Sequence, residues 1–328
     1  MRNAAAGSSK ILDFHPTVAR SGPGRPGGPG NRVANASPQG RRLIHGATGD
    51  KPVIVFGIVA DWPCRLRRHG RPRARGKPFP GHRNHDDPAT VQAGAPAYLL
   101  LLDGFIDESP DDPDLLIAGA RLNGVYATVF VEDPERARHL SGKARAYAGR
   151  ALCLRHPPMC AQDRRHFDEL APLLAAMTEA DVPALYTYAT VWAGWIQTRS
   201  GDWDAIADLP RVEAMLERVV ALDEGYDRGQ AHLYLGVMRT LLPPALGGRP
   251  GEGRAHFERA IALSKGRNLM AKVEFARRYA RLVFDQAMHD RLLREVLAAD
   301  PREPGLTLSN TLARRQAWQL LATSKDYF

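Results

Sequence analysis

The chain has 328 residues, a formal net charge of +9 at pH 7 and an isoelectric point near 9.7, which allow one or two domains and would ordinarily suggest an acidic partner such as nucleic acid. The charge lies at one end, because residues 1–85 contain sixteen Lys or Arg and three Asp, whereas residues 86–328 contain 29 basic and 33 acidic residues. The longer part is mildly acidic, which removes the case for nucleic acid.

Residues 1–85 contain no Glu and are rich in Gly, Pro and Arg. Such a segment cannot bury enough apolar surface to offset the entropy of ordering it, so we predict that it is disordered. A second hypothesis is that much of this segment is not a natural reading frame, since a shifted frame of a GC-rich gene yields a composition rich in Arg, Gly, Pro and Ala. The apolar residues 53–60 precede Cys64, as in a bacterial lipoprotein signal, but the intervening DWP does not suit a cleavage site. The segment is either a damaged or misread lipoprotein signal or a coincidence, and we expect no intact export signal in this chain.

Residues 86–328 have helical periodicity throughout, with apolar residues at i, i+3 and i+4 between turns rich in Pro, Gly and Asp. No stretch alternates like a β-strand, and no apolar run reaches the roughly 18 residues of a membrane span. We therefore predict one all-α domain over residues 86–328. Its twelve helices should be centred near residues 98, 120, 145, 171, 190, 203, 215, 234, 257, 275, 292 and 315, the one near 203 being short.

Cys153, His156 and Cys160 give a C-x2-H-x3-C pattern of possible metal ligands. A structural zinc site usually needs two well-spaced pairs of ligands, and Pro157 and Pro158 force an extended turn inside this one. In an exported protein, a disulfide between Cys153 and Cys160 would close the turn. The disulfide, two free thiols and a metal site remain open alternatives.

Signatures of catalysis are missing from the sequence. It has no nucleophile elbow, phosphate-binding loop or pair of His ligands on one helix face. His232 and His256 each lie in a helical stretch, where packing or surface exposure is favoured over a role in a pocket. We predict a non-enzymatic protein without a cofactor or metal.

One heptapeptide pattern recurs along the chain. AGRALCL from Ala148, LERVVAL from Leu216, FERAIAL from Phe257 and LREVLAA from Leu293 all have apolar first, fourth and fifth positions. Their spacings of 68, 41 and 36 residues lie near one or two periods of about 34 residues, the tetratricopeptide repeat. In HLYLG, Gly236 would let the paired helix approach closely. We predict a right-handed helical-repeat solenoid of degenerate tetratricopeptide-like helix pairs.

Several longer sequence segments occur in the same order as in a known protein family. The chain resembles the T component of tripartite ATP-independent periplasmic (TRAP) transporters, called TatT, from about Asp86 to Phe328. The matching phrases are DDPATVQAGAPAYLLLLDGF, VEDPERA, VPALYTYATVWAGWI, LPRVEAMLERVVALDEGYDRGQAHLYLG, LGGRPGEGRAHFERAIALSKG and LSNTLARRQAWQLL. The resemblance implies a non-catalytic periplasmic lipoprotein that forms a homotrimer and docks the solute-binding P component. Residues 1–85 do not match where the signal peptide and lipidated cysteine belong.

Six residues are candidates for ligand or partner binding: Tyr186, Tyr188, Trp192, Trp195, Tyr226 and Asn310. The first four lie on one predicted helix, where positions 188, 192 and 195 share a face. They could be core aromatics, or they could line a concave surface or channel for an apolar ligand or a partner's loop. Tyr226, in LDEGYDRG, and Asn310 could instead serve as capping or inter-helix hydrogen-bonding residues.

Two functions follow as hypotheses. The first is a TRAP-transporter T component that handles a small organic or hydrophobic solute with the P component and meets the membrane only through a lipid anchor. The alternative is a tetratricopeptide adaptor or envelope-assembly protein with a peptide in its groove. A monomer that binds an extended peptide would indicate the adaptor.

Overall fold

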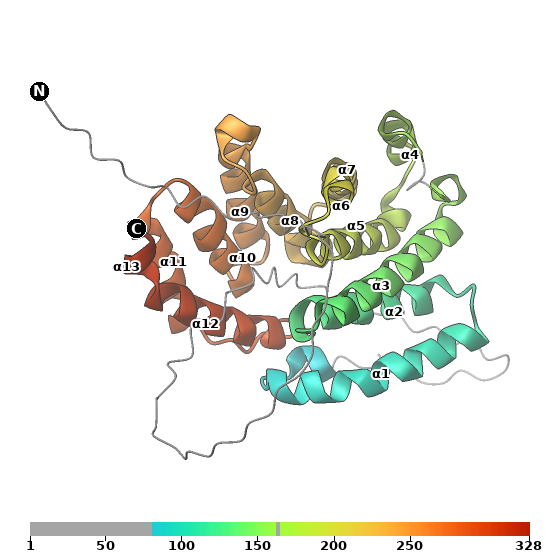
Figure 1. The fold of residues 1–328 in the computed structure, drawn as a ribbon, viewed down its shortest axis with the longest axis horizontal. Helices are drawn as coiled ribbons and strands as arrows, with labels where there is room; N and C mark the ends of the chain where they lie inside the picture. Colours follow the sequence, from blue (N-terminus) through green and yellow to red (C-terminus); the bar gives the residue numbers. More distant parts are fainter. Residues whose placement is uncertain (1–80, 162–164) are drawn as a thin grey trace, which may run out of the picture. The chain divides into compact units, whose positions relative to one another are not determined.

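The computed structural model describes residues 81–161 and 165–328. Within these two ranges every regular element is a helix and no β-strand occurs (Figure 1). The predicted all-α class is therefore confirmed. The predictions for the amino-terminal segment lie outside the described residues, except that Gly81–Asn84 form the short helix η1. The helical part thus begins five residues before the predicted boundary at residue 86.

The α-helices follow the predicted order, and each predicted centre lies within a helix. In chain order they are α1 (Pro88–Glu108), α2 (Pro113–Val125), α3 (Pro134–Arg155), α4 (Leu170–Ala175), α5 (Val182–Gln197), α6 (Trp203–Ala207), α7 (Leu209–Leu222), α8 (Gln230–Arg239), α9 (Pro250–Leu263), α10 (Leu269–Glu274), α11 (Gln286–Ala298), α12 (Thr307–Ala322) and α13 (Ser324–Tyr327). Two π-helical segments, η2 (Tyr126–Phe130) and η9 (Phe275–Ala280), continue α2 and α10. The short 3-10 segments are η1 (Gly81–Asn84), η3 (Pro157–Met159), η5 (Phe167–Glu169), η6 (Glu179–Asp181), η7 (Tyr226–Gly229) and η8 (Pro244–Leu246).

Aspartate side chains cap the amino ends of five helices. Asp87, Asp112, Asp133, Asp202 and Asp285 each accept hydrogen bonds from backbone N–H groups of the first helical turn. In α1, α2 and α3 a proline follows directly, where its fixed φ suits the first turn and its missing N–H costs nothing. The acidic and proline-rich turns of the sequence therefore set where these helices begin.

Successive helices pack against one another as antiparallel neighbours in the order of the chain (Figure 1). They form the pairs α2 with α3, α5 with α7, α8 with α9, and α10 and η9 with α11, while α3 also contacts α5 and α12 packs against α10 and α11. The second helix of each pair contains one copy of the recurring heptapeptide. Its first and fourth positions are buried in every copy: Ala148 and Ala151, Leu216 and Val219, Phe257 and Ala260, Leu293 and Val296.

Helices α8 and α9 cross at two glycines. A Cβ atom on Gly236 would lie 2.9 Å from the ring of Phe257, and one on Gly253 would lie 2.6 Å from the side chain of Thr240. These distances are too short for a side chain, so the crossing requires glycine at both positions. The close approach predicted at Gly236 is confirmed.

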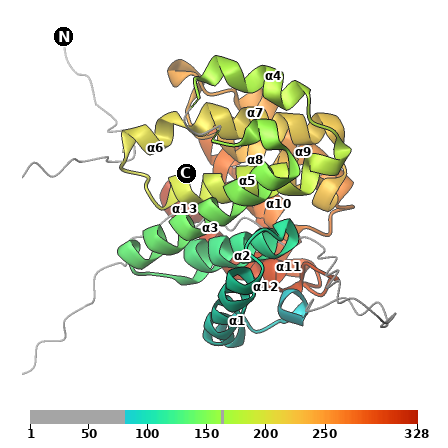
Figure 2. The same ribbon diagram turned by 90° about the vertical axis from the view of Figure 1, so that its right-hand side faces the viewer.

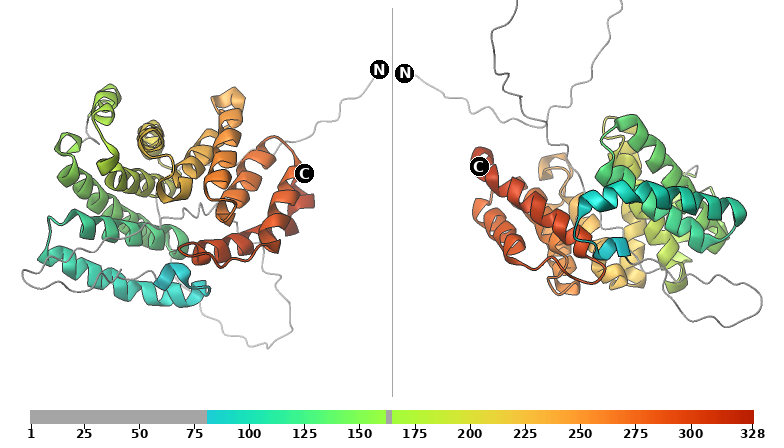
Figure 3. Two further views of the ribbon diagram at one scale, coloured as in Figure 1. Left: turned by 180° about the vertical axis from the view of Figure 1, so that it is seen from behind. Right: turned by 90° about the horizontal axis from the view of Figure 1, so that it is seen from below.

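The first and last parts of the described chain meet. Both η1 and α1 contact α12, and the views in Figure 3 show the start of α12 beside η1. The side-chain carbonyl of Asn84 accepts a hydrogen bond from the backbone N–H of Gly305 at 2.6 Å, across 221 residues of sequence. The turn before α12 is also held by Arg228, which donates to the carbonyl of Pro304 at 2.7 Å.

Helix α1 lies next to α2 at the edge of the described helices (Figure 2). It contributes one buried row to the structure, formed by Ala95, Leu99, Leu102 and Ile106. Among the described residues it is also the one helix whose length and composition would allow it to cross a membrane.

Candidate functional site

The predicted binding residues fall into two clusters and one isolated residue. Tyr186 and Tyr226 belong to an inner cluster between α2, α5 and α8, whereas Tyr188, Trp192 and Trp195 face α3. The rings of Tyr186 and Tyr226 lie 5.2 Å apart, edge to face. Helix α5 therefore sends its aromatic side chains to two opposite neighbours rather than to a single surface.

The inner cluster is a buried polar network. Tyr234 of α8 completes it, with its ring 6.3 Å from that of Tyr186. From α2, Arg121 donates to the hydroxyl groups of Thr187 at 2.8 Å and Tyr226 at 3.1 Å. Burial raises the pKa of all three tyrosines, so their hydroxyl groups stay neutral. The network joins three first helices of neighbouring pairs.

A left-handed turn adjoins this network. Asp227, Arg228 and Gly229 have φ angles of 47°, 60° and 75°. The first two conformations cost of order 1 kcal/mol each for residues with a side chain. Asp227 accepts a hydrogen bond from the hydroxyl of Tyr186 at 3.5 Å, and a Cβ on Gly229 would lie 2.5 Å from Leu263. Contacts with α5 and α9, together with the hydrogen bond from Arg228 to Pro304, thus hold a turn that the local sequence would not adopt by itself.

The second cluster stacks arginine on tryptophan. The guanidinium of Arg145, from α3, lies 4.3 Å from the ring centre of Trp192 and 4.5 Å from that of Trp195. The guanidinium of Arg199 lies 4.3 Å from the ring centre of Trp195, and the ring of Tyr188 packs 5.1 Å from that of Trp192. The predicted shared face of positions 188, 192 and 195 is present. It is occupied by cation–π contacts to α3, which leave it little exposed surface.

Asn310 connects helices and is almost fully buried, with an exposed fraction of 1%. Its amide oxygen accepts from the N–H of Leu269 at 3.0 Å, and its amide nitrogen donates to the carbonyls of Arg267 at 2.9 Å and Pro301 at 3.2 Å. These bonds satisfy backbone groups at the start of α10 and in the turn before α12. The side chain is thus engaged inside the fold.

His232 and His256 pair across α8 and α9, with their Nδ1 atoms 2.8 Å apart. The Nε2–H of His232 faces Glu224 at 3.1 Å, which makes its Nδ1 the acceptor for His256. Arg259 donates to both oxygens of Glu224. Burial lowers the pKa of both histidines, and the neighbouring His232 ring lowers the pKa of His256 further.

This pair predicts a pH dependence of stability. The folded-state pKa of each histidine lies below the ordinary 6.5, so the unfolded chain binds protons first as the pH falls. The contribution of the two neutral histidines to the free energy of unfolding is fully present above pH 6.5. It is lost as the pH falls below 6.5 through their folded-state pKa values. Glu224, whose pKa is lowered to about 2 mainly by its hydrogen bonds from Arg259, stays charged between pH 7 and 5. We expect the melting temperature of His256→Gln to fall less over this interval than that of the wild type; equal slopes in thermal melts would contradict the assignment.

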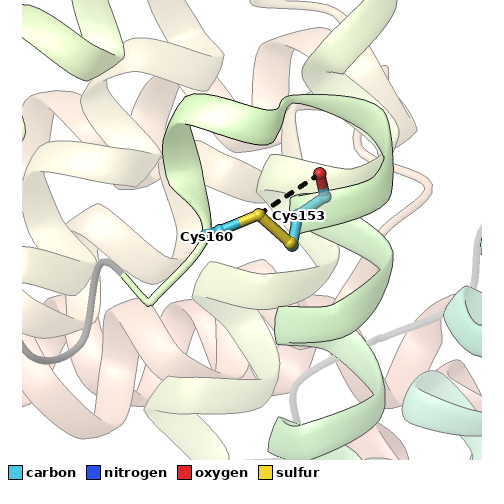
Figure 4. Close-up of a disulfide and its surroundings, with 2 residues drawn as sticks. All are labelled: Cys153 and Cys160. Atoms are coloured by element: carbon cyan, nitrogen blue, oxygen red, sulfur yellow. Dashed lines mark hydrogen bonds between the residues drawn. A yellow bond between two sulfur atoms is a disulfide. The ribbon is translucent and has the colours of Figure 1, made fainter.

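Cys153 and Cys160 are joined by a disulfide (Figure 4). Their Cα atoms lie 4.5 Å apart, and the bond ties the last turn of α3 to the end of η3. Sulfur atoms bonded to each other are not available as thiolate ligands, and in residues 81–161 and 165–328 no group of three or more His, Cys, Asp or Glu side chains is arranged to hold a metal ion. His156 faces the carboxylate of Asp181 at 3.6 Å.

None of the six predicted residues lines either of two surface grooves in the described part of the chain. The α4–α7 groove has a volume of about 510 Å³ and is mainly apolar, with lining residues Phe167, Asp168, Leu170, Ala171, Leu174, Ala175, Ala214, Glu217, Arg218 and Ala221. The second, about 450 Å³, lies between α9, η9 and α11. Its charged groups pair with one another, as in Lys272 with Glu295 and Arg254 with Glu258.

Comparison with known proteins assigns the family. The model of the TRAP transporter T-component family matches residues 84–328. The chain belongs to the TRAP transporter T-component family. No curated protein matches the sequence. The match begins in η1 and covers all the α-helices.

Membership makes the chain a component of a TRAP transporter, which is a non-catalytic role in the cell envelope. The match confirms the resemblance to this family that was inferred from the six sequence segments. In this T component, sequence reasoning missed Arg121, Arg145 and Arg199 as organising residues. Arg121 had a visible signal, since it is the single charged residue between Leu115 and Phe130. Arg145 acquires its role only when α3 meets α5, whereas Arg199 stacks on Trp195 four residues earlier in the same segment.

Proposed function

We propose that this T component docks the periplasmic solute-binding P component of its transporter and holds a small apolar ligand in the α4–α7 groove. The match over residues 84–328 supports the transporter role, and the groove is the observation that carries ligand binding. Its volume of about 510 Å³ is in the range of small-molecule sites, which are usually concave and mostly apolar.

Two of the three charged residues of the groove, Glu217 and Arg218, support an apolar ligand because they are already engaged elsewhere. Arg218 donates to the carbonyls of Ala175 at 3.1 Å and Met177 at 2.6 Å, which ties α7 to the end of α4. Glu217 pairs with the buried Arg239. What remains open between α4 and α7 is chiefly alanine, leucine and phenylalanine surface, where an apolar group gains free energy by leaving water.

The architecture that we infer is a right-handed solenoid of degenerate tetratricopeptide-like pairs. Besides the contacts within pairs, first helices contact the next first helix, as in α2 with α5, α8 with α10 and α10 with α12. Repeats that stack in this way form extended surfaces suited to partner binding. Such a surface is where we place the P component.

Export to the periplasm and a lipid anchor on the authentic gene product complete the proposal, together with assembly as a homotrimer. The disulfide supports export, because disulfides persist in the oxidising periplasm. The docking proposal is tested by co-elution of the full chain with the P component of the same transporter. Failure to form a complex across salt concentrations and with ligand-loaded P component would overturn it, and a monomer that captures an extended peptide would favour the adaptor function.

Filling the groove should abolish ligand binding. Ala214→Trp places an indole between α7 and α4, and we expect it to weaken binding of the apolar dye 8-anilinonaphthalene-1-sulfonate at least ~10-fold in fluorescence titrations, since an occupied pocket excludes the dye. Ala171→Trp fills the same groove from an exposed position on α4 and guards against misfolding of the first variant. Ala262→Trp, exposed on α9, is the matched control and should bind dye like the wild type. Unchanged binding in both groove variants would place the site elsewhere.

A further inference from the structure

Helix α3 and the turn after α5 bring three arginine side chains together. Arg138 and Arg145 lie on α3, with Gly142 between them on the same face, since positions i, i+4 and i+7 align along a helix. Arg199 follows α5 and donates to the backbone carbonyl of Arg138 at 3.0 Å. The guanidinium groups of Arg145 and Arg199 lie 4.5 and 4.3 Å from the ring centre of Trp195. Three positive charges therefore gather around Gly142.

Neutral groups hold two of these charges in place. Nε of Arg138 donates to the carbonyl of Thr198 at 3.4 Å, at the carboxyl end of α5, where a helix favours cations. Arg199 donates to the hydroxyl groups of Ser141 and Thr198 at 3.1 and 3.0 Å. Ser141 is itself 1% exposed. The guanidinium of Arg199 is thus fixed by hydrogen bonds and by its stacking on tryptophan, and its position does not depend on a carboxylate.

The three charges repel one another. In residues 81–161 and 165–328 neither Arg138 nor Arg199 forms a salt bridge. The pKa of Arg199 is lowered by burial and by the positive charges of Arg138 and Arg145. Asp202 acts in the opposite sense, but its carboxylate already accepts the hydrogen bonds that cap α6. An anion bound among the three guanidinium groups would relieve this repulsion.

Gly142 leaves room for such an anion. Apart from its chain neighbours and the backbone of α3, the one described atom within 4 Å of a Cβ placed on Gly142 would be Nη2 of Arg199, at 3.9 Å. The side chain of Arg138 is exposed, and its terminal nitrogens have no hydrogen-bond partner in the part of the chain that the structure describes. The space over Gly142 is therefore open and bordered by N–H donors.

We propose that Arg138, Arg145 and Arg199 bind a phosphate group over Gly142. A guanidinium group can form two parallel N–H···O bonds to one phosphate, and three positive charges favour a dianion over a monovalent ion. Inorganic phosphate and the phosphate of a lipid headgroup share this chemistry, and the experiment separates them. None of the four residues lines the α4–α7 groove, so the phosphate site stands or falls independently of the proposed ligand site.

Isothermal titration calorimetry of the full chain with inorganic phosphate, at constant ionic strength, measures the site. Arg138→Gln should weaken binding at least ~10-fold, because it removes a charge-assisted contact. The matched control is Arg150→Gln, which removes an exposed arginine of the same helix that already pairs with Asp111 and should bind phosphate like the wild type. The basic residues 1–85 are identical in all variants, so they contribute equally to each titration.

A second variant fills the site with a carboxylate of the chain itself. Gly142→Glu should abolish phosphate binding, and its urea midpoint of unfolding should exceed that of Gly142→Gln, which has nearly the same size and helix propensity without the charge. This gain in stability shows that the variant folds. Gly251→Glu, at an open position on α9, adds the same charge elsewhere and should bind phosphate like the wild type.

The outcomes assign or overturn the site. Binding of inorganic phosphate that is lost in Gly142→Glu and kept in Gly251→Glu supports it. Binding only to phosphatidylcholine vesicles that contain phosphatidic acid, with the same dependence on the variants, assigns the phosphate to a lipid. A wild-type chain that binds neither form overturns the proposal. So does binding that survives Arg138→Gln and Gly142→Glu, or that falls equally in the controls, since total charge would then account for it. Equal affinity for chloride overturns the choice of a dianion.

Discussion

Gly236→Val is expected to lower the free energy of unfolding by about 2–3 kcal/mol, the cost of overpacking a well-filled core. The new Cβ would lie 2.9 Å from the Phe257 ring. That ring is fully buried and stacks on Phe275 at 5.2 Å, so it has no direction in which to move. The β-branch adds a further atom at the tightest point of the α8–α9 crossing. Urea unfolding of the full chain measures the change as a lower midpoint at an unchanged slope.

Two controls separate crowding from helix propensity. At Gly251, in α9, an added Cβ would meet nothing within 4 Å, and Gly251→Ala should be neutral or stabilise slightly. Combining Gly236→Ala with Phe257→Leu should cost less than the sum of the two single changes, because the smaller side chain makes room for the methyl group. If Gly236→Val is as stable as the wild type, the close crossing of α8 and α9 is wrong.

Glu274→Ala is expected to cost about 3 kcal/mol, as for other buried ion pairs that lose one partner. Glu274 is 1% exposed at the junction of α10 and η9. Its carboxylate accepts from Arg277 at 2.9 Å and from Arg278 at 3.4 Å, and Arg277 extends the network to Gln316 of α12 at 2.7 Å. Without the carboxylate, two largely buried guanidinium groups would face each other. Glu274→Gln keeps one acceptor and should give an intermediate loss in urea unfolding.

The matched control for Glu274 is an exposed pair on a neighbouring helix. Glu258 accepts from Arg254 four residues earlier on α9, and both side chains are more than half exposed. Solvent screens that pair, so Glu258→Ala should change stability by no more than about 0.5 kcal/mol. Equal losses for Glu274→Ala and Glu258→Ala would show that the Glu274 network does not hold α10 and η9 to α12.

The helical order of this chain was predictable because the signals that set it are local. The recurring heptapeptide marks Phe257 and its counterparts as buried by spacing alone, and Asp–Pro turns mark where helices begin. The positive φ angles at Asp227 and Arg228 were not predictable, because Asp visits the left-handed region only as a single residue, Arg rarely does, and distant contacts impose the run here. Tertiary packing overrode local preference there.

The candidate site was less predictable than the fold. Spacing placed Tyr188, Trp192 and Trp195 on one face of a helix, but it did not tell which helix that face would meet. The stacking of Arg145 depends on the α3–α5 contact, and the α4–α7 groove joins segments about 40 residues apart in sequence. A contact or groove that forms between two helices cannot be read from the sequence of either helix alone.

The hydrogen bond between Asn84 and Gly305 bears on how the chain folds. A row of repeats with free ends can begin folding at any pair and grow outward, since each pair needs only its neighbours. Joining η1 to α12 closes a loop of 221 residues, a contact that is slow to form until the intervening helices have shortened the distance. The contact thus adds a late closing step to a sequence of local steps.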